Sequence, residues 1–296
     1  MQPNAPSDEI RGKQPGEVKK PSSGSTDINE MTSLRSPPVN KEMYDTDYFI
    51  HHAGGADWYD RLLLTDVENI YPIYRQVIEN LKPKPNERVL DIGCGRGEIV
   101  GILAVKGVQA FGLDFSSAAL KLASTVRDAF RRDQQTSFHL VRADATAIPF
   151  PAMSFDHIVL SDVVEHLHNW QLEKLYSECW RVLKPLGSIV VHTWPNLWHT
   201  KHTYPFVARI SRLLRIPRPL NHRQAHDEIM HVNEQSLRSI RYGLRRANFK
   251  ICKSWCEHNA SLSWNPRSIV YWFFHRAPGL RLFFADHIWV LAMKDR

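Results

Sequence analysis

The stretch Arg88-Val89-Leu90-Asp91-Ile92-Gly93-Cys94-Gly95-Arg96-Gly97-Glu98 decides the fold. Its apolar residues Val89, Leu90 and Ile92 predict a short buried parallel strand, and the glycines that follow let the chain turn sharply into a helix over residues 99–103. A ligand has to approach such a turn closely. Dinucleotide-binding enzymes use a similar turn to hold a pyrophosphate at the helix N-terminus, so the glycines alone do not identify the ligand.

Two acidic residues of this stretch favour a cationic ligand over a phosphate. Glu98 stands where the dinucleotide fingerprint has its third glycine. Asp91 places a carboxylate just before the loop, where it repels a phosphate and attracts an ammonium group. S-adenosylmethionine, which carries an amino group and a sulfonium and has no phosphate, fits these charges.

Six motifs, in this order, resemble those of the class I S-adenosylmethionine-dependent methyltransferases. They are the acid and glycines at 91–97, Gly112-Leu113-Asp114-Phe115-Ser116, Arg142-Ala143-Asp144-Ala145, and the segments 155–161, 164–167 and 181–187. The resemblance covers residues 87–194 and is to the type 11, ubiquinone-biosynthesis-like small-molecule methyltransferases. It implies S-adenosyl-L-methionine as the cofactor. It also implies a Rossmann-like α/β fold, with a mostly parallel seven-stranded sheet, helices on both faces and an antiparallel last strand.

The predicted strands end in polar residues that suit this cofactor, because ligands of such sheets bind beyond the carboxyl ends of the strands. Asp114 lies about 20 residues after the glycines, the separation that puts an acid beside a ribose hydroxyl pair. Asp144 is predicted to accept from the adenine amino group, with an ordinary loop acid as the alternative, and Ser161 with Asp162 to border the methionine part. The predicted cofactor-binding set is Asp91, Gly93, Cys94, Gly95, Gly97, Asp114, Phe115, Asp144, Ala145 and Ser161.

Glu165 and His166 are the predicted catalytic residues. A hydroxyl acceptor has to lose a proton, and a histidine suits that task near neutral pH. The resemblance places this region against the acceptor, while a purely structural His166 is the alternative. Some ubiquinone-pathway O-methyltransferases bind a divalent ion at a similar acid-x-x-Glu-His cluster. Asp162, Glu165 and His166 have this spacing, and His222, His226 and His231 form a second set with metal-like spacing. Neither set is predicted to hold a metal.

Composition divides the chain into a tail and one domain. Residues 1–42 are rich in Pro, Ser, Gly and charged residues and have no aromatics, which predicts a disordered tail. The methyltransferase domain is predicted over 43–296. It would comprise an aromatic segment at 43–82 that either packs on the domain or covers the cofactor as a lid, a core at 86–194, and a proline- and histidine-rich substrate-recognition insertion at 195–232. Apolar residues spaced by three and four predict a helix over 67–81. A second helix, which Asn233 would cap, and closing strands are predicted over 233–296.

Positive charge is concentrated in the C-terminal third. Residues 194–253 contain 12 Lys or Arg against 3 Asp or Glu, including Arg238, Arg241 and Arg245 on one face of a predicted helix. A solvated basic face is the simple interpretation. Such a field also attracts an anionic acceptor or, with the aromatic stretch 269–284, a membrane surface. Nucleic acid ranks lower because no RNA-binding module accompanies the charge.

The sequence contains no run of about 18 apolar residues and no apolar core of a secretory signal, so a cytoplasmic protein, in contact with a membrane surface at most, is predicted. The four cysteines are predicted to be reduced. The predicted function is methyl transfer to a small-molecule, saccharide or lipid-linked acceptor, by O-methylation. Methylation of protein or RNA, and a non-catalytic module that binds S-adenosylmethionine, are the alternatives.

Overall fold

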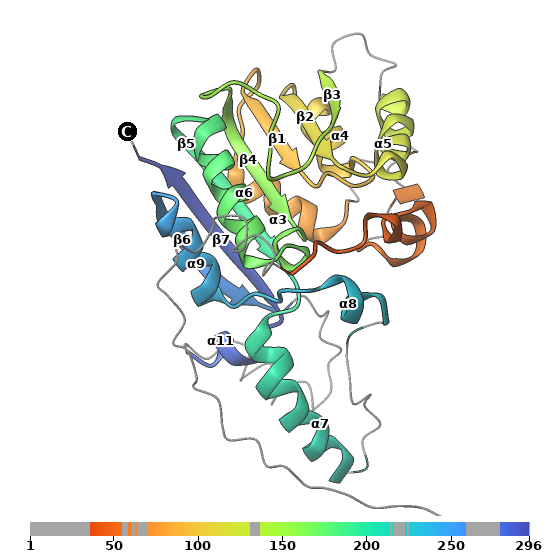
Figure 1. Ribbon diagram of the computed structural model, residues 1–296, viewed down its shortest axis with the longest axis vertical. Helices are drawn as coiled ribbons and strands as arrows, with labels where there is room; N and C mark the ends of the chain where they lie inside the picture. Colours follow the sequence, from red (N-terminus) through yellow and green to blue (C-terminus); the bar gives the residue numbers. More distant parts are fainter. Residues whose placement is uncertain are drawn as a thin grey trace, which may run out of the picture. The chain divides into compact units, whose positions relative to one another are not determined.

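The computed structural model in Figure 1 describes residues 36–54, 59–60, 63, 70–130, 137–213, 215, 223, 225–258 and 279–295. Apart from Ser36, these residues belong to one compact unit, Pro37–Arg296. Three predictions fall wholly or mostly outside the described residues: the tail up to residue 35, His222 of the second metal set, and the aromatic stretch up to residue 278.

A seven-stranded sheet forms the centre of this unit, with the strand order β3-β2-β1-β4-β5-β7-β6. All neighbouring pairs are parallel except those made by β7, which is antiparallel to both β5 and β6. The predicted fold class is therefore confirmed. The strands are β1 (Arg88–Ile92), β2 (Gln109–Asp114), β3 (Phe138–Arg142), β4 (Phe155–Ser161), β5 (Leu183–Thr193), β6 (Phe249–Glu257) and β7 (His287–Lys294).

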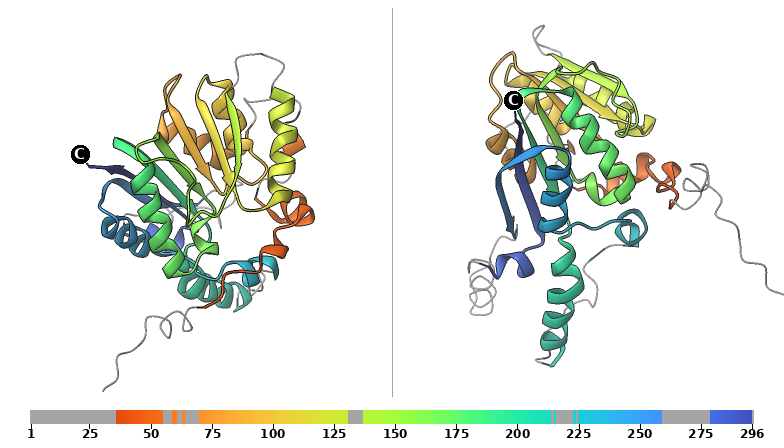
Figure 2. Two further views of the ribbon diagram at one scale, coloured as in Figure 1. Left: turned by 45° about the horizontal axis from the view of Figure 1, so that its top comes forward. Right: turned by 60° about the vertical axis from the view of Figure 1, so that its left-hand side comes forward.

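Helices cover both faces of the sheet (Figures 1 and 2). Alternate residues of each central strand point into two separate cores, as the pleat of a strand requires. One core joins the sheet to α6 and α9, and the other joins it to α3, α4 and α5. The described helices are α3 (Pro72–Leu81), α4 (Glu98–Val105), α5 (Ser117–Phe130), α6 (Asn169–Val182), α7 (Tyr204–Leu213), α8 (Ala225–Met230), α9 (Leu237–Arg246) and α11 (Arg281–Phe284).

The ordered contacts of the domain begin before residue 43, where the sequence predicts its start. A short 3₁₀ helix spans Lys41–Met43. The Lys41 ammonium lies 3.2 Å from the Asp144 carboxylate, and His168 Nε2 donates to the Pro37 carbonyl at 2.9 Å. Residues 37–42 are poor in apolar side chains, so composition assigns them to the tail, but polar contacts with distant residues hold them.

Two helix boundaries differ from the predicted ones. The helix predicted over 67–81 begins at Pro72 in α3, a residue that suits a first helical position because its missing N–H would have no partner there. The N-cap of α9 is Ser236, whose Oγ accepts from the Ser239 amide at 3.1 Å, whereas the sequence predicts Asn233. Asn233 Nδ2 instead donates to the Leu167 carbonyl at 2.8 Å and so fastens the end of the insertion beside residues 165–167.

None of the helices that the structure describes is both long enough and apolar enough to span a membrane.

Candidate active site

A cavity of about 430 Å³ lies at the carboxyl ends of β1, β2, β4 and β5. This is the end of a parallel sheet at which ligands bind, and the volume is within the range of small-molecule sites. Residues of the segment 38–54 also line the cavity, as do Asp227 and His231 from the far end of the insertion. Three parts of the chain that are distant in sequence therefore enclose one space.

The glycine loop between β1 and α4 forms one wall. Gly93 has a φ of +71°, and a Cβ added there would lie 2.6 Å from Val163 Cγ2, so only glycine fits. Gly97, which is also predicted to bind the cofactor, lies between α4 and α5. It does not line the cavity, and an added Cβ would meet Ala123 Cβ at 2.9 Å. Gly97 thus allows α4 to approach α5 closely, while Gly93 and Gly95 border the cavity.

Asp114, at the end of β2, is buried and shapes the same loop. Its Oδ2 accepts from the Gly95 amide at 3.0 Å, and its Oδ1 accepts from the Ser116 amide at 2.8 Å. Burial raises the pKa of Asp114 above its ordinary value, although these backbone hydrogen bonds oppose the shift. Each carboxylate oxygen retains a further lone pair, so Asp114 can still accept from two ligand hydroxyls.

Asp144, after β3, is held on both oxygens. Oδ1 accepts from the Thr146 amide at 2.9 Å and from its hydroxyl at 2.8 Å, and Oδ2 accepts from Lys41 Nζ at 3.2 Å. Burial acts to raise the pKa of Asp144, but the hydrogen bonds from Thr146 and Lys41 outweigh it and lower the pKa. Asp144 is therefore ionised at neutral pH and faces the cavity as an acceptor.

Arg96 fastens the N-terminal segment over the glycine loop. Its buried guanidinium donates to the carbonyls of Phe49 and Gly54, both at 2.9 Å, and pairs with Glu98 at 2.6 Å. Ser116 Oγ adds a hydrogen bond to the Tyr44 carbonyl at 2.7 Å. Residues of the segment 38–54 therefore lie against the glycine loop and line part of the cavity. Sequence analysis missed Arg96, although its place between two motif glycines was a signal.

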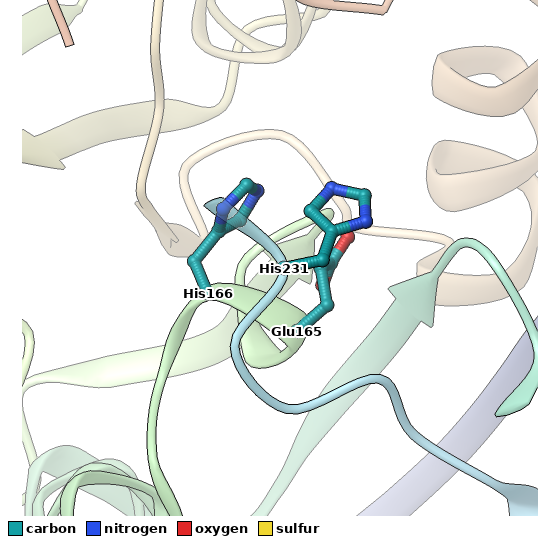
Figure 3. A group of neighbouring side chains, drawn as sticks. All are labelled: Glu165, His166 and His231. Carbon is teal, nitrogen blue, oxygen red and sulfur yellow. The ribbon is translucent and has the colours of Figure 1, made fainter. Parts of the chain in front are cut away.

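Glu165 and His166 lie in a 3₁₀ turn, Val164–His166, that follows β4. Glu165 Oε2 accepts from the Thr193 hydroxyl at 2.8 Å. His166 Nδ1 lies 3.2 Å from the Met230 carbonyl. A carbonyl can only accept, so this nitrogen carries the proton and Nε2 is left with a lone pair. The His231 ring meets the His166 ring edge-on, with 4.8 Å between centroids (Figure 3).

Both imidazoles are uncharged near neutral pH. Burial lowers the pKa of His166 to about 3, and the neighbouring His231 contributes to this shift. Burial likewise lowers the pKa of His231 to about 4. Glu165 is also buried, and burial together with the nearby Asp162 raises the pKa of its carboxyl well above the usual range. His166 and His231 therefore give this part of the cavity two neutral, partly buried proton acceptors.

A second line of polar groups runs from the cavity along β5 and β7. His192 Nδ1 lies 3.1 Å from Asp162 Oδ1, outside the angle of a good hydrogen bond, and His192 Nε2 lies 2.9 Å from His287 Nδ1. Further on, His258 Nδ1 lies 2.8 Å from Asp286 Oδ1. Sequence analysis missed His287, because its approach to His192 depends on the pairing of β5 with β7.

Comparisons with known proteins agree with this geometry. Residues 90–191 match the family model described as a methyltransferase domain. A probable S-adenosylmethionine-dependent methyltransferase of Mycobacterium tuberculosis is 31% identical over 133 residues, which cover 44% of this chain and 44% of that protein. A ubiquinone biosynthesis O-methyltransferase of Paracidovorax citrulli is 31% identical over 128 residues, 43% of this chain and 52% of that protein. The matched region thus spans about half the length of these curated relatives.

The arrangement of the sheet is also that of a solved structure, an S-adenosylmethionine-dependent methyltransferase from Methanosarcina mazei. The TM-score is 0.52 at 20% identity, over 76% of this chain and 98% of that chain. Residues 90–191 therefore form a methyltransferase domain, and the sheet that contains them has the class I arrangement. Of the predicted cofactor-binding residues of the methyltransferase domain, all except Gly97 line the cavity, as do Glu165 and His166. Arg238, Arg241 and Arg245 are not among its lining residues.

Neither set with metal-like spacing forms a group among the residues that the structure describes, and His222 of the second set lies outside them. Asp162 precedes the turn with a φ of +55° and contacts His192, and the His226 ring stacks on His52 with 3.8 Å between centroids. Within the described residues, a metal-like group forms instead from Glu165, His166 and His231, whose ligand atoms all lie within 4.8 Å of one another (Figure 3). Two imidazoles and a carboxylate are a donor set that suits zinc.

Proposed function

We propose that this protein transfers the methyl group of S-adenosylmethionine to a hydroxyl group of a small-molecule, saccharide or lipid-linked acceptor. One observation carries the proposal: a single cavity is lined by Asp91, Asp114 and Asp144 at the ends of β1, β2 and β3, and by the neutral imidazoles of His166 and His231 on the side of β4 and β5. A relative named for O-methylation in ubiquinone biosynthesis supports a hydroxyl acceptor.

The carboxylate end suits the cofactor. We assign the ribose hydroxyls to Asp114 because its oxygens keep free lone pairs after shaping the loop. Asp144 would accept from the adenine amino group and share its carboxylate with Lys41. Asp91, buried at the end of β1, would lie beside the methionine ammonium, and Ser161 would border the same part of the ligand.

The imidazole end suits the acceptor. A sulfonium is a good leaving group, so most of the rate can come from holding the nucleophile in line with the methyl carbon. Such positioning lowers the activation free energy by roughly 7–11 kcal/mol in well-oriented systems. The oxygen–carbon bond forms as the sulfur–carbon bond breaks, and His166 Nε2 takes the hydroxyl proton. Burial opposes charge on His166, but Asp162 and Asp227 both act to raise its pKa and so stabilise the imidazolium.

Cofactor binding is expected to release a proton from Asp91. In the empty site burial, together with Glu98 and Asp114, raises the pKa of Asp91 well above its ordinary value. A bound ammonium group favours the ionised form and lowers that pKa. The affinity should therefore rise with pH until the pH exceeds the empty-site pKa of Asp91, and stay level above it. Calorimetry in two buffers of different ionisation heat measures the protons released. An equal release from Asp91→Asn would contradict this role.

Methyl transfer from labelled S-adenosylmethionine tests the proposal as a whole. The purified protein is incubated with cell extract, which is then separated into small-molecule, lipid, saccharide, protein and RNA fractions. We expect label in the small-molecule, lipid or saccharide fraction, and roughly 10²- to 10⁴-fold slower labelling when His166→Ala replaces the wild type. Label in protein or RNA would favour the alternative acceptors. Cofactor binding without label in any fraction would favour a non-catalytic module.

A further inference from the structure

Helix α7 exposes large apolar side chains, which in most helices of a folded domain face the core. Its buried residues are Tyr204, Ala208 and Ser211, whereas three large apolar side chains are exposed: Phe206 by 59%, Ile210 by 42% and Leu213 by 83%. At about 100° per residue, the two sets lie on opposite faces of the helix. A contiguous apolar stripe of this kind on a soluble protein marks an interaction surface.

Basic residues accompany the stripe. Arg209 and Arg212 are exposed on α7, and Arg215 follows it. In the part of the chain that the structure describes, no carboxylate forms an ion pair with Arg209 or Arg212. The sequence from 188 to 226 contains six Lys or Arg and no Asp or Glu. The surface around the stripe is therefore positively charged.

α7 also lies at the cavity end of the sheet. Trp194, at the end of β5, lines the cavity, and the chain reaches α7 ten residues later through the short π-helix His199–Thr203. Figure 1 and the right-hand view of Figure 2 show α7 leading away from the sheet, with its far end apart from the other helices and strands. A surface bound by α7 would therefore lie beyond the end of the sheet at which the cavity lies.

We propose that α7 docks on an anionic membrane surface, with its apolar stripe at the boundary of the acyl chains and its arginines among the headgroups. An amphipathic helix with basic residues beside its apolar face binds membranes in this way. A second copy of the chain would bring like charges together across the stripe, whereas anionic lipid complements them. The proposal does not depend on methyl transfer, although it would place the cavity near a lipid-linked acceptor.

Flotation of the full chain with lipid vesicles tests this surface. Wild-type protein should float with vesicles of phosphatidylcholine and phosphatidylglycerol, and much less with phosphatidylcholine alone or at high salt. The triple variant Phe206→Gln, Ile210→Gln and Leu213→Gln should lose at least about tenfold in partition coefficient. The double variant Arg209→Gln and Arg212→Gln should lose about 30-fold at low salt, because each basic residue near an anionic surface contributes a few-fold.

A matched control separates this effect from a general loss of surface hydrophobicity. Met153 and Leu186 are 57% and 55% exposed, and they lie near the starts of β4 and β5, at the end of the sheet away from the cavity. Met153→Gln with Leu186→Gln should float like the wild type, and circular dichroism should show that every variant is folded. Undiminished flotation of the α7 triple variant would overturn the proposal. So would a wild-type dimer in sedimentation that the triple variant abolishes, with no vesicle binding.

Discussion

Replacing His166 by alanine is expected to slow methyl transfer by roughly 10²- to 10⁴-fold, the range for loss of a general base. The effect should fall on kcat, while the affinity for S-adenosylmethionine stays nearly unchanged, because His166 lies at the imidazole end of the cavity and its ring is next to His231. Steady-state kinetics on the identified acceptor give the rate, and calorimetry gives the affinity. His139→Ala, at an exposed histidine of β3 outside the cavity, is the matched control and should keep full activity.

The pH dependence of the wild-type rate adds an independent check. Burial lowers the pKa of His166 to about 3, so the imidazole stays unprotonated as the pH falls from neutrality. At saturating S-adenosylmethionine the rate should therefore hold down to about pH 5.5, whereas a histidine of ordinary pKa would lose roughly tenfold there. Full activity of His166→Ala would exclude it as the base and direct attention to His231 or His192.

Replacing Arg96 by alanine is expected to destabilise the fold by about 3–5 kcal/mol, because it leaves Glu98 as a buried carboxylate without its partner. The side chains of Arg96 and Glu98 are 2% and 7% exposed. The same change removes the hydrogen bonds to the Phe49 and Gly54 carbonyls, so residues 44–54 should become easier to cleave with protease. Denaturant unfolding measures the first effect and limited proteolysis measures the second.

Two further variants show which contacts of Arg96 cause these effects. Arg96→Met with Glu98→Leu removes both charges and should recover much of the lost stability, while the N-terminal segment stays easy to cleave. Arg127→Ala breaks a half-exposed pair with Asp128 and should cost no more than about 1 kcal/mol. Equal stability of Arg96→Ala and Arg127→Ala would show that the buried pair does not stabilise the fold. Unchanged cleavage of residues 44–54 in Arg96→Ala would show that Arg96 does not hold the segment.

Much of the fold and of the cofactor end followed from local patterns. The strands of the core are short apolar runs, and Asp91, Asp114 and Asp144 lie at or just after their carboxyl ends, so topology alone brings these acids together. The Asp114 carboxylate even bonds to the glycine loop that the sequence placed beside it, at 3.0 Å from the Gly95 amide. Information of this kind lies within a few residues of each motif.

The features that sequence analysis missed depend on contacts between distant parts of the chain. Lys41 belongs with the tail by composition, yet it pairs with a carboxylate 103 residues away. His287 joins His192 only because β7 inserts between β5 and β6. Gly97 looks like a ligand-binding glycine, but the space that it leaves is filled by α5. Helical spacing grouped Asp162 with His166, but Asp162 has a left-handed backbone conformation and the chain turns there. His231, from a distant segment, lies beside Glu165 and His166 instead.

Binding of S-adenosylmethionine to Asp114→Ala tests the central claim, that the cavity beside the glycine loop is a methyl-donor site. Calorimetry should show one site in the wild type, no comparable binding of NAD, and a loss of about 1.5–3 kcal/mol in the variant, because a hydrogen bond to a charged group is removed. Asp128→Ala, at an exposed acid of α5, should bind like the wild type. Unchanged affinity in Asp114→Ala, or tighter binding of NAD than of S-adenosylmethionine, would contradict the account.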